Sequence, residues 1–295
     1  MTTRLQLRAT WRLELSEVSS LALTGSGRRR RLLAVGDEAY GVASTPVPRA
    51  GRRAVTAYHD LRAVLGPEIT GVRGGSEFEG VTCDASGHVF VLQEGPSRVL
   101  VLDPRLDALR ATIELEVDPA RPGYGATWRA DANARGESLQ VLPDGHLLVA
   151  KQKDPVVLVE FGPAGDAPVG LESVQLGRSG EPFRFRAESP YVVLADWTVA
   201  AGAGLRSLND LSVDEAGRLY CVSSRSRTIV RFAGAGVAGS TARVDAQWEL
   251  PEELFAGTDR KAEGLVVQPG PAFLVAFDSD RPELDNLALA VPADG

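Results

Sequence analysis

The residues best suited to chemistry in this sequence are acids that stand at both ends of short apolar hairpins. In the stretch EFEGVTCDASGHVFVLQE, which spans residues 77–94, Glu79 precedes one apolar run and Glu94 ends a second. A Gly-containing turn separates the runs, so such a hairpin brings Glu79 and Glu94 together at its open end. Carboxylates gathered in this way bind a hard cation or exchange protons with a substrate.

Hairpins of the same pattern recur along the chain. Further copies begin at Ser19, Glu137, Asn209 and Glu263, and each places two apolar residues two positions apart before a turn that contains glycine. Period-two alternation is typical of strands and does not fit helices. The copies start roughly 55–70 residues apart, a spacing that leaves room for four strands in each.

A third and a fourth strand complete the copies. The third strand is predicted in the runs RVLVLD, VVLVEF, TIVRF and NLALAV. Tryptophan marks the fourth strand: Trp128, Trp197 and Trp248 occupy it in three copies, and Trp11 is its equivalent before the first hairpin. Since the last copy ends after three strands, we expect residues 3–14 to supply its fourth strand and to close a ring.

We therefore predict an all-β protein, a five-bladed β-propeller of four-stranded antiparallel blades. It forms a single domain over residues 1–295, with blades that begin near residues 19, 79, 137, 209 and 263. The N-terminal strand joins the last blade. The alternative, a propeller of six blades, requires a further hairpin that we do not find in the sequence.

The acids of the copies are expected at one mouth of the central channel. In a propeller the first strand of each blade is innermost, and its start lies on the same face as the turn after the second strand. The first ring, at the start of the inner strands, consists of Ser19, Glu79, Glu137, Asn209 and Glu263. The second ring, at the end of the second strands, consists of Asp37, Glu94, Gln152, Ser224 and Asp278.

The first ring has the composition of a site for a hard cation. Carboxylates crowded around a narrow channel repel one another unless a cation or protons neutralise them. Ligands that are all oxygen suit Ca²⁺, and we predict calcium bound by Glu79, Glu137, Asn209 and Glu263. In the alternative interpretation the acids only cap strands or form ion pairs. The basic residues available for such pairs are Lys151, Lys153, Arg206 and Arg225.

Catalysis in such a ring has to come from carboxylates and a bound cation. The candidate catalytic residues are Glu94, Asp37 and Asp278, with Glu94 as the best general base. The candidate substrate-binding residues are Lys151, Lys153 and Arg225, which suit a small anionic or ester-type molecule. These residues predict a metal-dependent hydrolase of a lactone, ester or phosphoester. The alternative is a non-catalytic propeller that binds a ligand or a protein and holds a structural metal.

Two segments are longer than the repeat requires. The stretch AYGVASTPVPRAGRR, residues 39–53, follows the second strand of the first copy. We expect it to lie over the acidic face as a lid or a rim of the site. The stretch GEPFRFRAESPY, residues 180–191, is a second addition whose face the sequence does not determine.

The repeated motifs also resemble a known family. The runs EGV with DASGHVFVLQE, ESLQVLPDGHLLVAKQKDP, NDLSVDEAGRLYCVSSRSR and AEGLVVQ are similar to the SdiA-regulated proteins and, more distantly, to phytase-like esterase domains. This resemblance covers nearly the whole chain and implies a propeller with Ca²⁺ at the channel mouth. Paraoxonase-like and gluconolactonase-like propellers hold a channel metal with a set that Glu137, Asn209 and Glu263 resemble. Ser19 and Gln152 depart from a fully acidic pattern.

Other chemistries find little support in the sequence. His88 and His146 both follow a turn glycine and are expected as turn-edge residues on the face opposite the acids, and His59 belongs to an outer strand. No histidine is therefore placed for a nucleophile triad or for zinc. The GAGVAG motif at residues 234–239 lies between two predicted strands, whereas a dinucleotide fingerprint requires a helix after it.

Composition limits the partners and the compartment. The net charge of −7, without a basic stripe, argues against nucleic acid as a partner. The N-terminal stretch alternates apolar and charged residues, so we expect neither a signal peptide nor a membrane anchor. Cys83 and Cys221 lie inside apolar runs and are expected as buried free thiols, which fits a reducing cytoplasm. We expect a cytoplasmic monomer.

Overall fold

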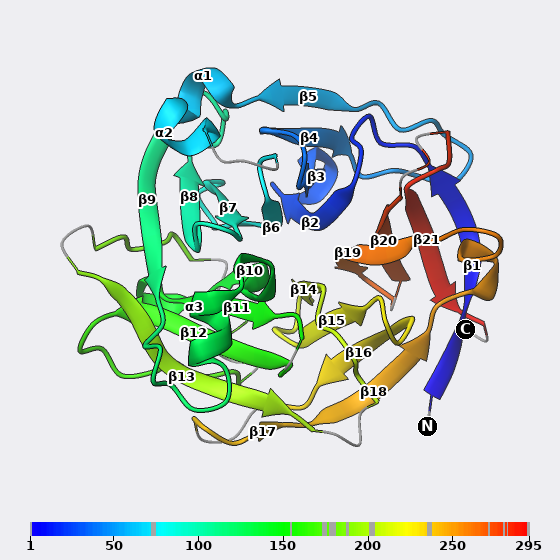
Figure 1. The fold of residues 1–295 in the computed structure, drawn as a ribbon. Coiled ribbons are helices and arrows are strands. Elements are labelled where there is room, and N and C mark those ends of the chain that lie inside the picture. The colour runs from blue at the N-terminus through cyan, green and yellow to red at the C-terminus, as the bar shows by residue number, and fades with distance from the viewer. Residues whose placement is uncertain are drawn as a thin grey trace.

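The computed structural model describes residues 2–71, 75–153, 155–172, 176, 181–186, 189–200, 204–234, 238–270, 272–279, 281 and 283–293. Short β-strands dominate these residues and are arranged around a central axis, as Figure 1 shows. The strands nearest the axis are β2 (Val18–Thr24), β6 (Phe78–Cys83), β10 (Gly136–Val141), β14 (Asp210–Val213) and β19 (Lys261–Gln268). This arrangement is the architecture of a β-propeller.

Each inner strand pairs antiparallel with the next strand of the chain. The second strands are β3 (Arg31–Gly36), β7 (Val89–Gln93), β11 (Leu147–Lys151), β15 (Leu219–Ser223) and β20 (Ala272–Asp278). The third strands are β4 (Gly41–Pro46), β8 (Arg98–Leu102), β12 (Val157–Pro163), β16 (Thr228–Phe232) and β21 (Leu287–Pro292). The outer strands are β5 (Ala57–Asp60), β9 (Leu109–Glu116), β13 (Tyr191–Val199), β18 (Val244–Glu249) and β1 (Thr2–Trp11).

Pairing between outer strands merges neighbouring units into larger sheets. β9 pairs parallel with β13, and β1 pairs parallel with β18. The strands therefore form sheets of four, eight and nine members, with the two-residue strand β17 (Thr241–Ala242) attached to β13. Sheet membership alone consequently does not give five separate blades.

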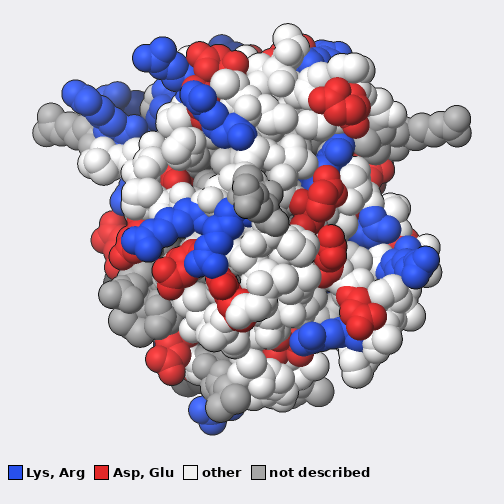
Figure 2. Space-filling view, turned by 90° about the vertical axis from the view of Figure 1, so that its left-hand side faces the viewer, with Lys and Arg blue, Asp and Glu red and all other residues white. Residues whose placement is uncertain are grey.

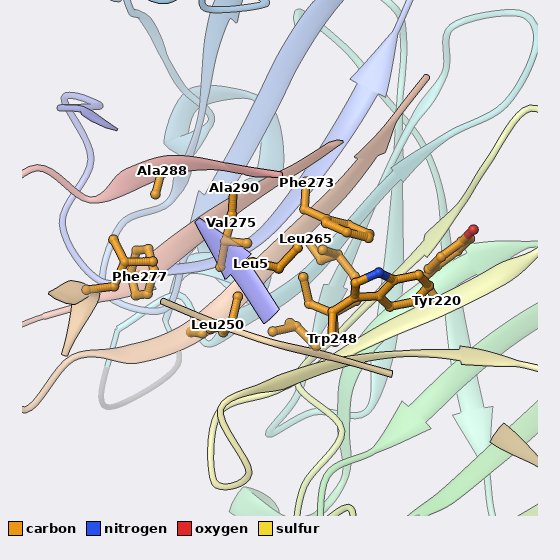
Figure 3. Close-up of a cluster of buried hydrophobic side chains, with 14 of the residues drawn as sticks. Leu5, Tyr220, Trp248, Leu250, Leu265, Phe273, Val275, Phe277, Ala288 and Ala290 are labelled. Atoms are coloured by element: carbon orange, nitrogen blue, oxygen red, sulfur yellow. The ribbon is translucent and has the colours of Figure 1, made fainter. Parts of the chain in front are cut away.

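The N-terminal strand lies beside the last strand of the chain. β1 pairs antiparallel with β21 from Leu5 opposite Pro292 to Trp11 opposite Leu287, and the N and C labels lie on the same side of the ring in Figure 1. Figure 3 shows Leu5 among buried side chains of β18 to β21, including Trp248 and Val275. The pairing expected from the position of Trp11 is therefore present.

Three of the four tryptophans lie in outer strands, but Trp128 does not. Trp128 belongs to the short helix α3 (Gly125–Ala130), and the outer strand of its unit is β9, earlier in the chain. The prediction for Trp128 was wrong because the helix covers the same core that a strand would cover. Its ring lies 5.8 Å from that of Phe161, and its Nε1 donates to Ser97 Oγ at 3.1 Å.

The segment at residues 39–53 is not a lid over the acidic face. Residues Gly41–Pro46 form β4, and Pro46 pairs with Arg31 at the end of the sheet remote from Asp37. The segment at residues 180–191 lies partly outside the described residues. In its described part, the Phe183 amide donates to Asp84 beside the β6–β7 turn, which places it on the face opposite the acids. Of the GAGVAG motif, residues 235–237 lie outside the described part of the chain.

The remaining helical elements are short. They are α1 (Arg62–Leu65), α2 (Pro67–Thr70) and the 3-10 turns at Gly27–Arg29, Ala132–Ala134, Pro143–Gly145 and Glu252–Leu254. No helix in the described part of the chain is long and apolar enough to cross a bilayer. On the side shown in Figure 2, basic side chains gather at the upper left, and acidic and basic side chains are interspersed over the rest of this face.

Candidate functional site

Irregular pairing at the start of the inner strands positions most of the first ring. The register shifts between Phe78 and Gly80 in β6, and corresponding shifts in β2, β10 and β19 occur at residues 18–20, 136–138 and 262–264. The residues passed over by these shifts are Ser19, Glu79, Glu137 and Glu263. An extra residue in one strand of a pair bends the strand and redirects its side chain. The repeated irregularity thus accounts for acids at one end of the channel.

The glutamates of the first ring interact with one another. Burial, followed by the charges of Glu94, Glu263 and Asp37, raises the pKa of Glu79 well above its usual range, and a hydrogen bond with Ser19 opposes this. Burial and the charges of Glu79, Glu94 and Glu263 likewise raise the pKa of Glu137. Burial and the charge of Asp278 raise the pKa of Glu263 to about 7. The charges of these acids therefore act on one another at one end of the channel.

Asn209 faces this site with its amide nitrogen. Its Oδ1 accepts hydrogen bonds from Ser207 Oγ at 2.7 Å, from the Ser224 amide at 2.9 Å and from Ser224 Oγ at 3.0 Å. Its Nδ2 donates to Glu263 Oε1 at 3.4 Å. A backbone amide can only donate, so the Ser224 amide fixes this orientation of the side chain. In this geometry Asn209 does not offer the oxygen that a metal ligand requires.

The second ring contains acids in different environments. Glu94 is buried and accepts from the Arg135 amide at 3.0 Å. Burial raises the pKa of Glu94 to about 7, although the Arg135 amide and the charge of Lys153 oppose this shift. Asp278 forms an ion pair with Lys261 at 2.6 Å. Glu94 consequently titrates near neutral pH, whereas the Asp278 carboxylate already has a cationic partner.

Two buried oxygens of the second ring, Asp37 Oδ1 and Gln152 Oε1, accept no hydrogen bond from an N–H or hydroxyl group among the described residues. The Asp37 carboxylate is, however, within hydrogen-bond reach of the Glu17 carboxyl group, and burial and this contact raise the pKa of Glu17 to about 7. Buried acceptors of this kind destabilise a protein unless a donor or a cation satisfies them. Their positions at the acidic mouth mark it as a place where a ligand would be stabilised.

The basic residues assigned to substrate binding lie in three different environments. Lys151 is fully buried, and its Nζ donates to the carbonyl of Lys153. Lys153 is partly exposed, and its charge lowers the pKa values of Glu94, Glu137 and Glu263. Arg225 is exposed beside the ring, where its amide donates to Ser207 Oγ at 3.3 Å. Of these three, Lys153 interacts most directly with the acids.

The donor atoms of the acidic mouth are of the type that binds a cation, but their geometry is not that of a metal site. Carboxylates and unpartnered oxygens are donors that Ca²⁺ accepts. Among the described residues, however, no group of three or more His, Cys, Asp or Glu side chains is arranged to hold a metal ion. The acids of the mouth thus have suitable chemistry, but their described geometry is not that of a formed metal site.

The sequence did not identify two buried polar sites. Asp210, directly after Asn209, is fully buried on the axis and accepts hydrogen bonds from several inner strands. His146 is not a turn-edge residue: it is buried, with Nδ1 2.7 Å from Glu160 and Nε2 3.4 Å from Asp166. The acidic partner of His146 follows it by only 14 residues in an adjacent strand, so the alternation in that strand contained a usable signal.

The other side chains that could do chemistry lie apart from this site. His88 pairs with Asp84 at 3.2 Å near the β6–β7 turn, remote from the end that carries Glu79. Cys221 is a buried free thiol as predicted, while Cys83, also free, is partly exposed.

Comparison with known proteins supports the fold. No family model matches the sequence, and no curated protein matches it. The crystal structure of Myxococcus xanthus glutaminyl cyclase has a TM-score of 0.53 to this chain at 11% identity, with 99% of this chain and 98% of that chain covered. At this identity the likeness concerns the fold alone.

Two further solved structures are similar over most of their length. The PQQ-bound aldose sugar dehydrogenase of Streptomyces coelicolor has a TM-score of 0.48 at 11% identity, with coverage of 99% of this chain and 98% of that chain. The β-propeller domain of Myceliophteria thermophila Cps50 (Swd1) has a TM-score of 0.41 at 9% identity, with coverage of 92% and 83%.

Proposed function

We propose that this chain is a five-bladed β-propeller whose acidic channel mouth binds a divalent cation, with calcium the best match to its oxygen donors. The observation that carries the proposal is the set of three mutually repelling glutamates, Glu79, Glu137 and Glu263, with the buried Gln152 Oε1 unpartnered at the same mouth. A cation bound by these glutamates removes their mutual repulsion, and an amide oxygen such as that of Gln152 is a donor that Ca²⁺ accepts. The proposed ligands are Glu79, Glu137 and Glu263, with Asn209 donating to Glu263.

The pairing within the sheets supports the proposed count of five blades. Each of the inner strands begins an antiparallel run of four strands, and the last run is completed by β1. The parallel pairs β9–β13 and β1–β18 join outer strands of neighbouring runs. We attribute the sheets of eight and nine strands to these lateral contacts. The kinship with SdiA-regulated and phytase-like esterase proteins, and a cytoplasmic monomer, belong to the same proposal.

The test of cation binding is a thermal shift. A ligand at a hundredfold excess over its Kd stabilises the folded state by about 2.7 kcal/mol. For 295 residues the entropy of unfolding is about 0.6 kcal/mol/K, so the melting temperature of chelator-treated protein should rise by about 4 °C with calcium. Magnesium, which prefers a smaller octahedral shell, should have a weaker effect.

Matched variants distinguish calcium binding at the first ring from a general effect of removing one negative charge. Glu137→Gln and Glu263→Gln should lose the calcium response. Glu116→Gln removes one charge from the exposed end of β9 and should respond like the wild type. A wild type that ignores both calcium and chelator contradicts the proposal. In that case Lys153 would be the neutralising partner, and Lys153→Gln would itself lower the melting temperature.

Hydrolysis is a second candidate, supported by Glu94. A carboxyl with a pKa of about 7 can take a proton from water at neutral pH, and Lys153 lies close enough to affect that pKa. Lys153 and Arg225 would hold an anionic or ester-type substrate, with Asp37 and Asp278 as further acids. A bound cation would supply charge stabilisation of a substrate oxygen.

The activity test is a panel of a lactone, an aryl ester and an aryl phosphodiester, with and without chelator. Activity that rises with pH through about 7 and disappears in Glu94→Gln supports a hydrolase. A peptide with an N-terminal glutamine belongs in the panel because of the structural likeness to a glutaminyl cyclase. Calcium binding without turnover of any substrate supports the alternative, a non-catalytic propeller with a structural metal.

A further inference from the structure

The inner strands expose one edge to the channel, and the amides on that edge need acceptors. Buried backbone N–H groups are almost always paired, and an inner strand has no neighbouring strand on its axial side. Equivalent amides in four units donate to side chains on the axis. These amides belong to Leu21, Val81, Leu211 and Leu265.

A single carboxylate, that of Asp210, is the centre of these contacts. Asp210 Oδ2 accepts from the Leu21 amide at 3.0 Å and from the Leu265 amide at 2.8 Å. Asp210 Oδ1 accepts from Ser20 Oγ at 3.0 Å and from Ser138 Oγ at 2.6 Å. We call Ser20, Ser138 and Asp210 the axial cluster. Its members come from β2, β10 and β14, and Leu265 adds β19.

The two serines extend the cluster to the remaining inner strand. Ser20 Oγ accepts from the Val81 amide in β6 at 3.0 Å while it donates to Asp210. Ser138 Oγ accepts from the Leu211 amide at 2.9 Å while it donates to Asp210. Every hydrogen bond runs toward the carboxylate, which has acceptor sites for all of them. Asp210 therefore links β2, β6, β10, β14 and β19 at one point.

The sequence leaves room for only one large side chain in this layer. The positions equivalent to Asp210 in the other units are Ser20, Gly80, Ser138 and Gly264. A Cβ at Gly80 would lie 3.0 Å from the Leu139 amide, and a Cβ at Gly264 would lie 2.7 Å from Leu21 Cγ. The glycines thus allow the inner strands to approach the axis closely enough to reach Asp210.

The axial cluster lies directly beneath the first ring. Ser20, Ser138 and Asp210 immediately follow Ser19, Glu137 and Asn209, and Gly264 immediately follows Glu263. We propose that Asp210 is the positioning residue of the first ring: it fixes the inner strands relative to one another and so sets the directions from which the first-ring side chains reach the channel mouth. This arrangement does not depend on the identity of the ligand.

The first test is amide hydrogen exchange, followed residue by residue by NMR. In Asp210→Asn an NH2 group replaces one carboxylate oxygen and faces groups that are themselves donors, so hydrogen bonds to the side chain are lost. The Leu21 and Leu265 amides should therefore exchange about tenfold faster or more. The Ser224 amide reports the ring itself, because it donates to Asn209 Oδ1. Its exchange should also accelerate, by about threefold or more. If Asp210 stabilised only the axial cluster, the exchange rate of the Ser224 amide would not change in Asp210→Asn, and the positioning role would be refuted.

The control is Ser212→Ala, which removes another channel side chain two residues further along β14. Ser212 Oγ accepts from the Val267 amide at 3.1 Å, so that amide should lose protection while Ser224 keeps it. If Asp210→Asn does not fold, Ser138→Ala replaces it, since it removes one hydroxyl donor to Asp210. Wild-type exchange at Leu21, Leu265 and Ser224 in a folded variant overturns the proposal.

The second test uses terbium luminescence as a probe of the ring, and this arm rests on the proposed function. Asp210→Asn should raise the Kd for terbium about tenfold, because donors displaced by a fraction of an ångström no longer converge. Ser212→Ala should change the Kd by less than about threefold. Equal effects of both variants overturn the positioning role. If the wild type binds no terbium, cation binding fails, and the exchange of Ser224 alone decides the role of Asp210.

Discussion

Trp11 offers the sharpest test of how the ring is closed. Its side chain is 4% exposed, its backbone pairs with Leu287 of the last strand, and its Nε1 donates to the Arg52 carbonyl at 2.8 Å. One residue near the N-terminus thus joins the end of the chain and the loop after β4. Replacing Trp11 with alanine removes the packing and leaves the Arg52 carbonyl without its donor.

The expected cost can be worked from these contacts. Truncation of a buried tryptophan to alanine lowers the free energy of unfolding by about 3–5 kcal/mol. With an unfolding entropy of about 0.6 kcal/mol/K for 295 residues, the melting temperature should fall by about 5–8 °C. Trp11→Phe keeps most of the apolar area and loses the hydrogen bond, so its loss should be about 1–2 kcal/mol.

Differential scanning calorimetry of the three proteins, with Arg8→Ala as a control, provides the measurement. Arg8 lies on the same strand with an exposed side chain, and its replacement should change stability by less than about 0.5 kcal/mol. The reasoning is refuted if Trp11→Ala melts within about a degree of Arg8→Ala, because the N-terminal strand would then contribute nothing to closure.

The remaining predictions concern other parts of the ring. Deletion of residues 1–14 exposes the edge of β21, so we expect aggregation during size-exclusion chromatography; a soluble monomer with an unchanged melting temperature contradicts this. Gly80→Ala should lower the free energy of unfolding by about 1–3 kcal/mol because the new Cβ meets backbone atoms. The Cβ of Gly234→Ala would meet only Glu172 Cα, at an ordinary contact distance of 3.9 Å, so this variant should be neutral in urea unfolding. Burial lowers the pKa of His146, but Glu160 and Asp166 outweigh it and raise the pKa above its unfolded value. The pair therefore stabilises most below about pH 6.5 and loses this contribution as pH rises through the folded pKa. His146→Gln should accordingly lose about 3–5 kcal/mol at low pH and less at high pH, with calcium affinity within a few-fold of wild type. A loss that does not vary with pH would show that His146 contributes by packing alone.

The sequence determined most of the secondary structure that surrounds the site. The alternation in VTC and VFVLQ predicted β6 and β7, and the same pattern located each of the other inner hairpins to within two residues of its observed start. Trp11 before the first hairpin predicted the β1–β21 pair. These features are readable because a strand with one buried face repeats its apolar residues every second position, whatever its neighbours are.

The sequence was less informative where a short segment can be either a strand or another element at the same place in the fold. The core beneath Trp128 is covered by a helix, and the run at residues 41–46 is an ordinary third strand. Both segments are short, and local pattern does not separate a covering helix from a strand or a strand from a loop over such lengths. The spacing of the acids predicted their gathering at one mouth of the channel, but the orientation of the Asn209 amide was not predictable.

The sequence by itself thus determined a ring of repeated hairpins with acids at one mouth, because those properties reside in each repeat. Only the tertiary structure decided that Asp210 stands on the axis. Its partners Ser20, Ser138 and Leu265 lie 190, 72 and 55 residues away along the chain. In sequence Asp210 is one more acid beside a strand. It becomes the centre of the molecule only when five inner strands converge and their axial amides require an acceptor.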